Sequence, residues 1–539
     1  MSGDTTSGEL PGVLRNSPSL GARAARVASG VVAWLSENAA DIVMATSLGA
    51  LTALVVTLNL EGIGSGGDAI RKWDFVREWF YANSFRHAAW DHHMARFGVH
   101  WLTYLVQRFL GRGPAMYYAP GLITVTFQTM CVYACGKRLG GRLAGVAAAL
   151  LLAVFKPTIS AGSQLMPEVF SATYAMFAFY LYLRYHDAAG RAKTAWLVAM
   201  SVVLFVGYLG KETTVFFYPG FVVAIWLGGG KRVRDVGIFV GVIGLGVLLE
   251  TACYRAFTEY ANRMAVIVAN HTPDDNAGPR DFWELFNRFV KLDEPWKIGI
   301  YTFLPIGFTV AVFSKSRRVW AAYAVTMGYL FLLVFGVRRL HPFAVWHSFR
   351  VRYFDVLAPF VQLFAGLFVA LLARELLSQS GKAQARFVKR FDSSRWAASA
   401  VVVLVALFGT VSYAIAAPHL SDHVFKFNAE ISDIATDAYV RGLPIVSTRD
   451  PRATWVVYSV LIDDKLLAKH GKLPPFDDVK IVDGDRFWLV KDRDRYDLDK
   501  LRRLQRARCV VEVTVKKPAP ISVVRPMHRL PASCDRLVE

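Results

Sequence analysis

Acidic, basic and imidazole side chains gather in one short segment that directly follows a long uncharged run, MATSLGALTALVVTLNL. A carboxyl group at the edge of a bilayer is partly desolvated, which suits it to general-base catalysis. An arginine beside a histidine suits phosphate binding, because a guanidinium group pairs with two phosphate oxygens. Basic residues that only anchor the chain at the interface are the alternative. The residues concerned are Asp68, Asp74, Asp91, His92, His93 and Arg96.

The first two carboxyl groups allow two interpretations each. Asp68 follows the glycine-rich stretch GIGSGG, so it is either a general base or the N-terminal cap of the helix expected over IRKWDFVREWFYANS. Asp74 lies inside that amphipathic stretch, where it is either a second candidate base or part of the hydrated face. The pattern alone favours the cap and the hydrated face.

The DHH triplet predicts a phosphate or acceptor site rather than a metal site. On a helix, His92 and His93 would point about 100° apart, and the i, i+4 spacing that zinc favours is absent. His92 and Arg96 are four residues apart and would share one face of a helix. That pair is expected either to bind phosphate or to anchor the segment at the interface.

Further charges stand at the ends of later apolar runs. Glu168 in LMPEVF is expected at a helix N-terminus, facing the helix dipole. Lys211 and Glu212 interrupt two apolar runs, and they are either a local ion pair or a phosphate-binding lysine with its neighbour. Arg352 and Tyr353 precede another apolar run and add positive charge there, which an anionic ligand would explain.

Composition indicates a polytopic membrane protein. The 539 residues are 54% hydrophobic, and the mean hydropathy is +0.33. The net charge of +20 lies in basic residues between apolar runs, so it predicts positive-inside topology and an anionic ligand, not a nucleic acid. At about 20 apolar residues per helix the chain holds about eleven spans. They are Ile42–Leu60, Ala115–Gly136, Leu143–Ile159, Val169–Leu183, Ala195–Leu209, Thr213–Leu227, Val236–Ala252, Ile298–Phe313, Val319–Val337, Phe354–Ala373 and Ala397–Ala417.

Alternate loops predict the orientation of these spans. Short basic loops recur on one side, which is expected to be the cytoplasm; they contain Lys137, Arg184, Lys231, Lys315 and Lys382 with neighbouring basic residues. The chemically interesting charges then fall together on the opposite side. The sequence predicts a cytoplasmic segment over residues 1–40 and a membrane domain over 41–417. The first outer loop, 61–113, is expected to carry the active site.

The tail after Pro418 predicts a small extracytoplasmic α/β domain over residues 418–539. LPIVST, VKIVD, FWLVKD and CVVEVTV have strand character. ATWVVYSVLIDDKLLAKHG and DLDKLRRLQRA are expected to be helices. Nothing in this tail forms a catalytic constellation, so it is expected to bind the acceptor or to stabilise the outer face.

The ordered motifs resemble a known family. A first span followed by Gly67-Asp68, then an R-x-G at Arg96, precedes HWLTYLVQRFLG. A P-E at Glu168, a G-K-E at Lys211 and an R-Y at Arg352 follow at span ends. This order, over roughly Asp41 to Ala373, resembles the GT-C superfamily of membrane glycosyltransferases. The closer likeness is to the branch with protein O-mannosyltransferases and the aminoarabinose transferase of lipid A, which is glycosyltransferase family 39-like.

The resemblance implies a reaction and a set of roles. A sugar carried on a polyprenyl phosphate would be transferred with inversion to a hydroxyl acceptor outside the cytoplasm, at the plasma (inner) membrane. Asp68 would be the general base and Glu168 a second acid. Arg96, Lys211 and Arg352 with Tyr353 would bind the lipid phosphate. The family often has an acid or tyrosine soon after the first aspartate, and Ala69 and Ile70 stand there instead. The choice between Asp68 and Asp74 therefore stays open.

Other functions compete with the transferase. A flippase of a lipid-linked sugar also needs basic residues, but it favours charges at mid-membrane and broken helices. A membrane scaffold would leave the outer-loop acids dispensable. No cofactor is certain: a divalent cation is one alternative, with Asp68, His92 and Glu168 as its ligands. The expected partners are a polyprenyl-phosphate sugar, membrane lipids and a glycan, lipid or protein acceptor. Asp91, His92, His93 and Glu212 are expected to contact these substrates.

Overall fold

The computed structural model describes most of the predicted membrane domain and short pieces of the rest. Described are residues 20–60, 69, 72–73, 75–77, 92–229, 232–258, 260–270, 281, 283–284, 286–287, 295–339, 344–345, 351–379 and, further on, 445–447, 481–483, 511–513 and 523–525. The chain divides into two compact units, Met1–Ser47 and Leu48–Glu539. In the first unit, the described residues all belong to the beginning of helix α1.

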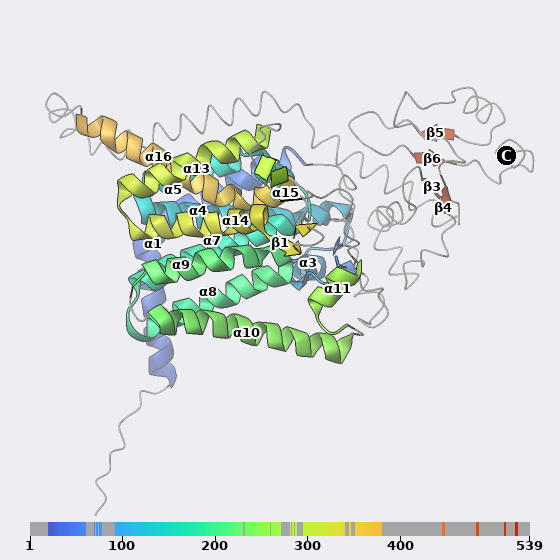
Figure 1. Ribbon diagram of the computed structural model, residues 1–539, viewed down its shortest axis with the longest axis horizontal. Helices are drawn as coiled ribbons and strands as arrows, with labels where there is room; N and C mark the ends of the chain where they lie inside the picture. Colours follow the sequence, from blue (N-terminus) through green and yellow to red (C-terminus); the bar gives the residue numbers. More distant parts are fainter. Residues whose placement is uncertain are drawn as a thin grey trace, which may run out of the picture. The chain divides into compact units, whose positions relative to one another are not determined.

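The described part of the membrane domain is helical apart from one short pair of strands, as its composition predicted (Figure 1). The α-helices are α1 (Leu20–Thr57), α3 (Phe97–Phe109), α4 (Ala119–Gly140), α5 (Arg142–Ala153), α6 (Lys156–Gly162), α7 (Pro167–Asp187), α8 (Gly190–Gly210), α9 (Tyr218–Leu227), α10 (Arg232–Phe257), α11 (Arg263–Asn270), α13 (Pro295–Ser314), α14 (Arg317–Phe335), α15 (Val351–Phe354) and α16 (Ala358–Gln379). The 3-10 helices are η1 (Pro114–Tyr118), η2 (Glu212–Phe217) and η3 (Asp355–Leu357).

Apolar runs long enough to cross a bilayer account for only part of the expected spans. Among the described residues, 5 helices are long and apolar enough, and a bent pair raises this number to 6. They are Asn38–Thr57, Gly190–Gly210, Arg232–Phe257, Arg317–Phe335, Asp355–Arg374 and the pair α5 with α6. Every predicted span up to Ala373 overlaps a helix, and the last one, Ala397–Ala417, lies outside the described residues. The total of about eleven spans therefore stays a prediction.

One predicted span is broken, which corrects the expectation of a single helix over Leu143–Ile159. Helices α5 and α6 meet at an angle of 64°. The break falls at Phe155, which has extended backbone and precedes the start of α6 at Lys156-Pro157. Pro157 has no backbone N–H to donate to the carbonyl oxygen four residues earlier, at Ala153, and α5 ends at that residue.

Small residues let the helices around α5 approach closely. A Cβ atom added at Gly136 in α4 would lie 2.7 Å from the Cα atom of Gly145 in α5. Likewise, a Cβ atom added at Gly366 in α16 would lie 2.5 Å from the backbone nitrogen of Ala148 in α5. Close backbone approach through small residues is typical of helix packing in membranes, where dispersion contacts replace the hydrophobic effect. The core thus fixes α4, α5 and α16 against one another.

The short basic loops meet at one end of the bundle. Asp187, at the end of α7, accepts a hydrogen bond from Arg138 of α4 at 2.7 Å and forms an ion pair with Arg318 of α14. Helix α7 has 21 residues, which at 1.5 Å per residue makes it about 30 Å long and so about as long as the hydrocarbon core is thick. Glu168, at its beginning, therefore lies at the opposite end from these loops.

The short strands form three separate pairs. Strand β1 (Val337–Arg339) pairs antiparallel with β2 (Ala344–Val345). In the tail, β3 (Ile445–Ser447) runs parallel to β4 (Ile481–Asp483), and β5 (Val511–Val513) runs antiparallel to β6 (Val523–Arg525). Strands β3, β4 and β5 lie within segments that had strand character, whereas β6 was not expected. FWLVKD and both expected tail helices lie outside the described residues, so the α/β domain stays a prediction.

Candidate active site

The centre of the site is a lysine placed between two carboxylates. Helix α8 ends at Gly210, Lys211 has extended backbone, and η2 begins at Glu212. The Lys211 side chain is 1% exposed. Its Nζ atom lies 3.4 Å from Oε1 of Glu168 and 3.2 Å from Oε1 of Glu212. The interpretation of Lys211 and Glu212 as a local ion pair is confirmed, and Lys211 forms a second ion pair with Glu168.

Glu168 reaches this lysine from the start of another helix. Met166 is the N-cap of α7, Pro167 is its first residue, and Glu168 lies in its first turn. Its carboxylate is buried near the positive end of the helix dipole, as expected. A single buried carboxylate therefore interacts with both a helix N-terminus and a lysine.

Arg96 contacts the same oxygen of Glu212 as Lys211 does. It is the N-cap residue of α3 and is 5% exposed, and its Nη2 atom lies 3.8 Å from Oε1 of Glu212. The buried Nε–H of Arg96 has no hydrogen-bond partner among the described residues. Because a guanidinium group has five donor hydrogens, Arg96 has donors left for a ligand.

A close helix crossing places Arg96 next to the lysine loop. Helix α3 crosses the end of α8, and a Cβ atom added at Gly98 would collide with the backbone nitrogen of Gly210 and the carbonyl oxygen of Val206. Tyr174 of α7 fixes the same turn, because its hydroxyl donates to the carbonyl oxygen of Gly98 at 2.7 Å. The Nε1 of Trp101 in turn donates to this hydroxyl at 2.6 Å.

The R-Y motif contributes an aromatic ring to the site. The centroid of the Tyr353 ring lies 4.9 Å from Nζ of Lys211, which is a cation–π distance. The backbone of Tyr353 is held by α14, because the Tyr329 hydroxyl donates to its carbonyl oxygen at 2.9 Å. Arg352 lies in the same short helix, α15, and its side chain is outside the described part of the structure.

The site includes one carboxyl that the sequence patterns did not single out. Asp355 opens η3 two residues after Tyr353, is half-buried, and feels the charge of Glu168. The signal was present, since R-Y-F-D places an acid at the start of an apolar run.

His92 and His93 lie in a turn, which corrects the expectation of a helix. Residues 92–95 form a turn and α3 begins at Phe97, so His92 and Arg96 do not share a helix face. The two imidazole rings do not diverge either: the ring centroids of His92 and His93 are 3.8 Å apart, with 43° between the planes. The predicted roles of His92 and His93 toward substrate stay predictions.

A third histidine fixes this turn to the start of α3. His100 lies in α3, and its Nε2 atom is 3.0 Å from the carbonyl oxygen of His93. The pKa of His100 is lowered to about 3, mainly by burial; the hydrogen bond to His93 raises the pKa, and the charges of Lys72 and Arg96 contribute to lowering it. His100 is therefore neutral at physiological pH, and Nε2 carries the proton that it donates to this carbonyl.

The remaining predicted site residues are Asp68, Asp74 and Asp91, which lie outside the described residues. The described part of the chain contains no group of three or more His, Cys, Asp or Glu side chains that could hold a metal ion. Two of the three ligands named for a divalent cation, His92 and Glu168, are described, but Asp68 is not. The cation therefore stays a prediction.

Comparison with known proteins agrees with this geometry. A family model described as dolichyl-phosphate-mannose-protein mannosyltransferase matches residues 95–252, which include Arg96, Glu168, Lys211 and Glu212. No curated protein sequence matches the chain.

Solved structures show the same fold at low sequence identity. The crystal structure of ArnT from Cupriavidus metallidurans bound to undecaprenyl phosphate has a TM-score of 0.54 and 14% identity, covering 90% of this chain and 98% of that one. The crystal structure of ArnT from Cupriavidus metallidurans in the apo state has a TM-score of 0.53 and 14% identity, and the match covers 92% of this chain and 98% of that one. The chain therefore has the fold of these ArnT structures, and the resemblance to membrane glycosyltransferases that its motifs predicted is confirmed.

Proposed function

We propose that this protein transfers a sugar from a polyprenyl phosphate to a hydroxyl acceptor outside the cytoplasm, with inversion at the anomeric carbon. The observation that carries the proposal is the buried network of Arg96, Glu212, Lys211 and Glu168. It lies at the end of the bundle opposite the basic loops, where helix ends meet. The solved ArnT structure, which has the same fold, is described as bound to undecaprenyl phosphate.

The chemistry is a single displacement. The acceptor oxygen attacks the anomeric carbon and forms the new glycosidic bond, while the bond from that carbon to the phosphate oxygen breaks. The acceptor proton goes to a carboxylate base, for which Asp68 or Asp74 is proposed. The electron pair of the broken bond stays on polyprenyl phosphate, the leaving group. Glu168 orients a substrate hydroxyl, and Asp91, His92 and His93 contact the acceptor.

The cations of the site stabilise the leaving phosphate as its charge grows. Arg96 offers its unused Nε–H together with its charge. Lys211 is paired with two carboxylates, so a phosphate must compete with Glu168 or Glu212 for its ammonium group. This competition favours the transition state over the resting donor, because a more negative phosphate oxygen competes better.

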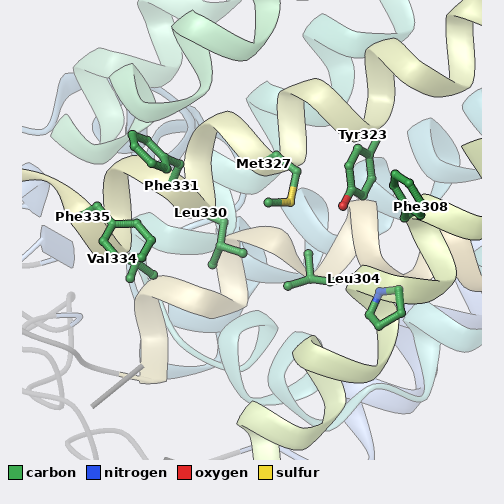
Figure 2. A pocket seen from close by; sticks show the side chains of 9 residues that line it. Leu304, Phe308, Tyr323, Met327, Leu330, Phe331, Val334 and Phe335 are labelled. Carbon is green, nitrogen blue, oxygen red and sulfur yellow. The ribbon is translucent and has the colours of Figure 1, made fainter. Parts of the chain in front are cut away.

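The donor's prenyl chain is proposed to lie in an apolar groove between α13 and α14. The groove has a volume of about 450 Å³, and it is lined by Leu304, Pro305, Phe308, Tyr323, Met327, Leu330, Phe331, Val334 and Phe335 (Figure 2). Leu330 directly follows Tyr329, which holds the backbone of Tyr353. The groove therefore runs along the helix that supports the phosphate end of the site.

Glu168→Gln is expected to lower sugar transfer by about tenfold to a hundredfold in kcat, because an amide orients a hydroxyl and Lys211 less well than a carboxylate. Purified protein would be given polyprenyl-phosphate sugars with cell-envelope extract, and the release of polyprenyl phosphate measured. Asp187→Asn makes the same chemical change at the opposite end of α7 and is the matched control. If the wild type released no polyprenyl phosphate but moved labelled lipid across a reconstituted bilayer, the protein would be a flippase and not a transferase.

Met327→Trp is expected to fill part of the groove and to raise the KM for a long-chain donor by about tenfold, equivalent to about 1.4 kcal/mol of lost binding. The KM for a donor with a short prenyl chain should stay the same, since that chain does not reach the groove. Val240→Trp adds the same ring to the exposed face of α10 and serves as the control. If the KM rose equally for both donors, the proposal that the prenyl chain lies in the groove would be wrong.

A further inference from the structure

A second buried ion pair lies outside the network described above. Arg263 opens α11 and is 0% exposed, and its Nε atom lies 3.3 Å from Oε1 of Glu250 in α10. The Arg263 guanidinium stands over the ring of Tyr208, 4.2 Å from its centroid. Its Nη1 also donates to the carbonyl oxygen of Leu209 at 3.4 Å.

Packing alone does not require a charge at Glu250. The buried residues of α10 form one stripe that runs Asp235, Phe239, Ile243, Gly246, Glu250 and Tyr254. Spacings of three and four residues place these side chains on one face, and at Gly246 that face touches the Phe205 ring of α8. An apolar residue would fill the place of Glu250 at least as well, because two buried charges lose their hydration and regain little in stability. A gain in stability therefore does not explain why these two buried side chains are charged.

The pair contacts the segment that carries Lys211, and residues of α10 and α11 close to the pair contact the segment that carries Arg96. On one side, Tyr208 and Leu209 immediately precede Gly210 and Lys211. On the other side, Val266 of α11 and Tyr254 of α10 pack with Ala95, the neighbour of Arg96. The Tyr254 and Phe97 rings meet edge to face at 6.2 Å. Residues of α10 and α11 thus contact the segment before Lys211 and the segment around Arg96.

We propose that Arg263 and Glu250 are a positioning pair that holds Lys211 and Arg96 in register for the lipid phosphate. The inference rests on the proposed function. Neither residue touches the phosphate: Arg263 acts through the carbonyl oxygen of Leu209 and the ring of Tyr208, and Glu250 fixes the guanidinium group. A displacement of about 1 Å in a positioned group costs up to about a hundredfold in rate.

The test replaces both charges by apolar side chains of similar length, Glu250→Met with Arg263→Met. Such a replacement leaves stability unchanged or raises it. We expect an unchanged melting temperature, a drop in kcat of about tenfold with the donor KM changed less than threefold, and about tenfold weaker binding of undecaprenyl phosphate alone. The matched control, Arg138→Met with Asp187→Met, removes a pair at the opposite end and should change none of these values.

The outcomes separate the pair's role from the proposed function. Equal kcat and equal undecaprenyl phosphate binding in the double variant and the wild type would overturn the positioning role. The double variant could instead lose melting temperature and activity in parallel, while Arg263→Lys, which keeps the charge, retains both. The pair would then be structural, and this result too would overturn the positioning role. A wild type that neither binds undecaprenyl phosphate nor transfers sugar would overturn the proposed function itself, and with it this inference.

Discussion

Lys211→Met should reduce sugar transfer by about 10³-fold, since it removes a charge that stabilises the leaving phosphate. In the folded protein, Glu168 and Glu212 lie 3.4 Å and 3.2 Å from Nζ of this lysine. Without the ammonium group both carboxylates stay buried and lose their shared cation. Breaking a buried pair in this way costs about 3–5 kcal/mol of stability, so the melting temperature should fall as well.

A second variant separates stability from catalysis. Lys211→Met combined with Glu212→Gln removes one of the two carboxylates that this lysine neutralised and should recover part of the melting temperature, while Arg96 remains at the site. It should recover no transfer, because the phosphate still lacks its cation. Lys211→Arg keeps the charge with a different shape, and we expect it to keep the fold with partial activity. If the combined variant regained wild-type kcat, Lys211 would be a structural residue and the phosphate would depend on other cations.

The convergence of distant charges at one site could be predicted from the sequence. Apolar runs define spans in a membrane protein because the bilayer demands about 20 apolar residues in a row. Once the spans are counted, basic loops assign the sides, and the charges at the remaining span ends must share one face. Glu168, Lys211 and Tyr353 are far apart in the chain, yet the structure brings them into contact.

Local geometry could not be predicted in the same way. The break at Phe155 is invisible to a hydropathy count, because the run continues through Lys156-Pro157 into further apolar residues. The turn at residues 92–95 has no glycine or proline to mark it. The tertiary hydrogen bond from His100 to the carbonyl oxygen of His93 holds it. A hydropathy pattern predicts the elements, whereas a proline or a side-chain hydrogen bond decides where the chain bends between them.

The Arg263–Glu250 pair shows a different limit. Glu250 lies within the predicted span Val236–Ala252, where an acid is costly and therefore informative. Its partner stands outside the span, beyond the end of α10, and only the fold brings the two together. The sequence could have marked Glu250 as unusual, but nothing in it could have linked this acid to Lys211 through the backbone of Leu209.

Gly98→Ala should lower kcat for sugar transfer about a hundredfold, although Gly98 has no side chain that could take part in the reaction. A methyl group at this position would collide with backbone atoms of Val206 and Gly210 and would lie 2.7 Å from the Cα atom of Gly210. Backbone cannot turn aside as a flexible side chain can, so α3 and α8 must separate. Arg96 lies two residues before Gly98 and Lys211 one residue after Gly210, and the separation pulls these cations apart. A shift of about 1 Å is enough for a loss of this size.

Two controls tie this effect to the helix crossing. Gly210→Ala places its methyl group 3.6 Å from the nearest atom of Gly98, an ordinary contact distance, so the same crossing should tolerate it. Gly241→Ala adds a methyl group to α10 where nothing lies within 4 Å, and it should leave both melting temperature and kcat unchanged. The measurement is kcat for polyprenyl phosphate release in all three variants. Equal activity of Gly98→Ala and Gly210→Ala would show that the site does not depend on the contact between α3 and α8. Arg96 would then have to be positioned by the turn before it.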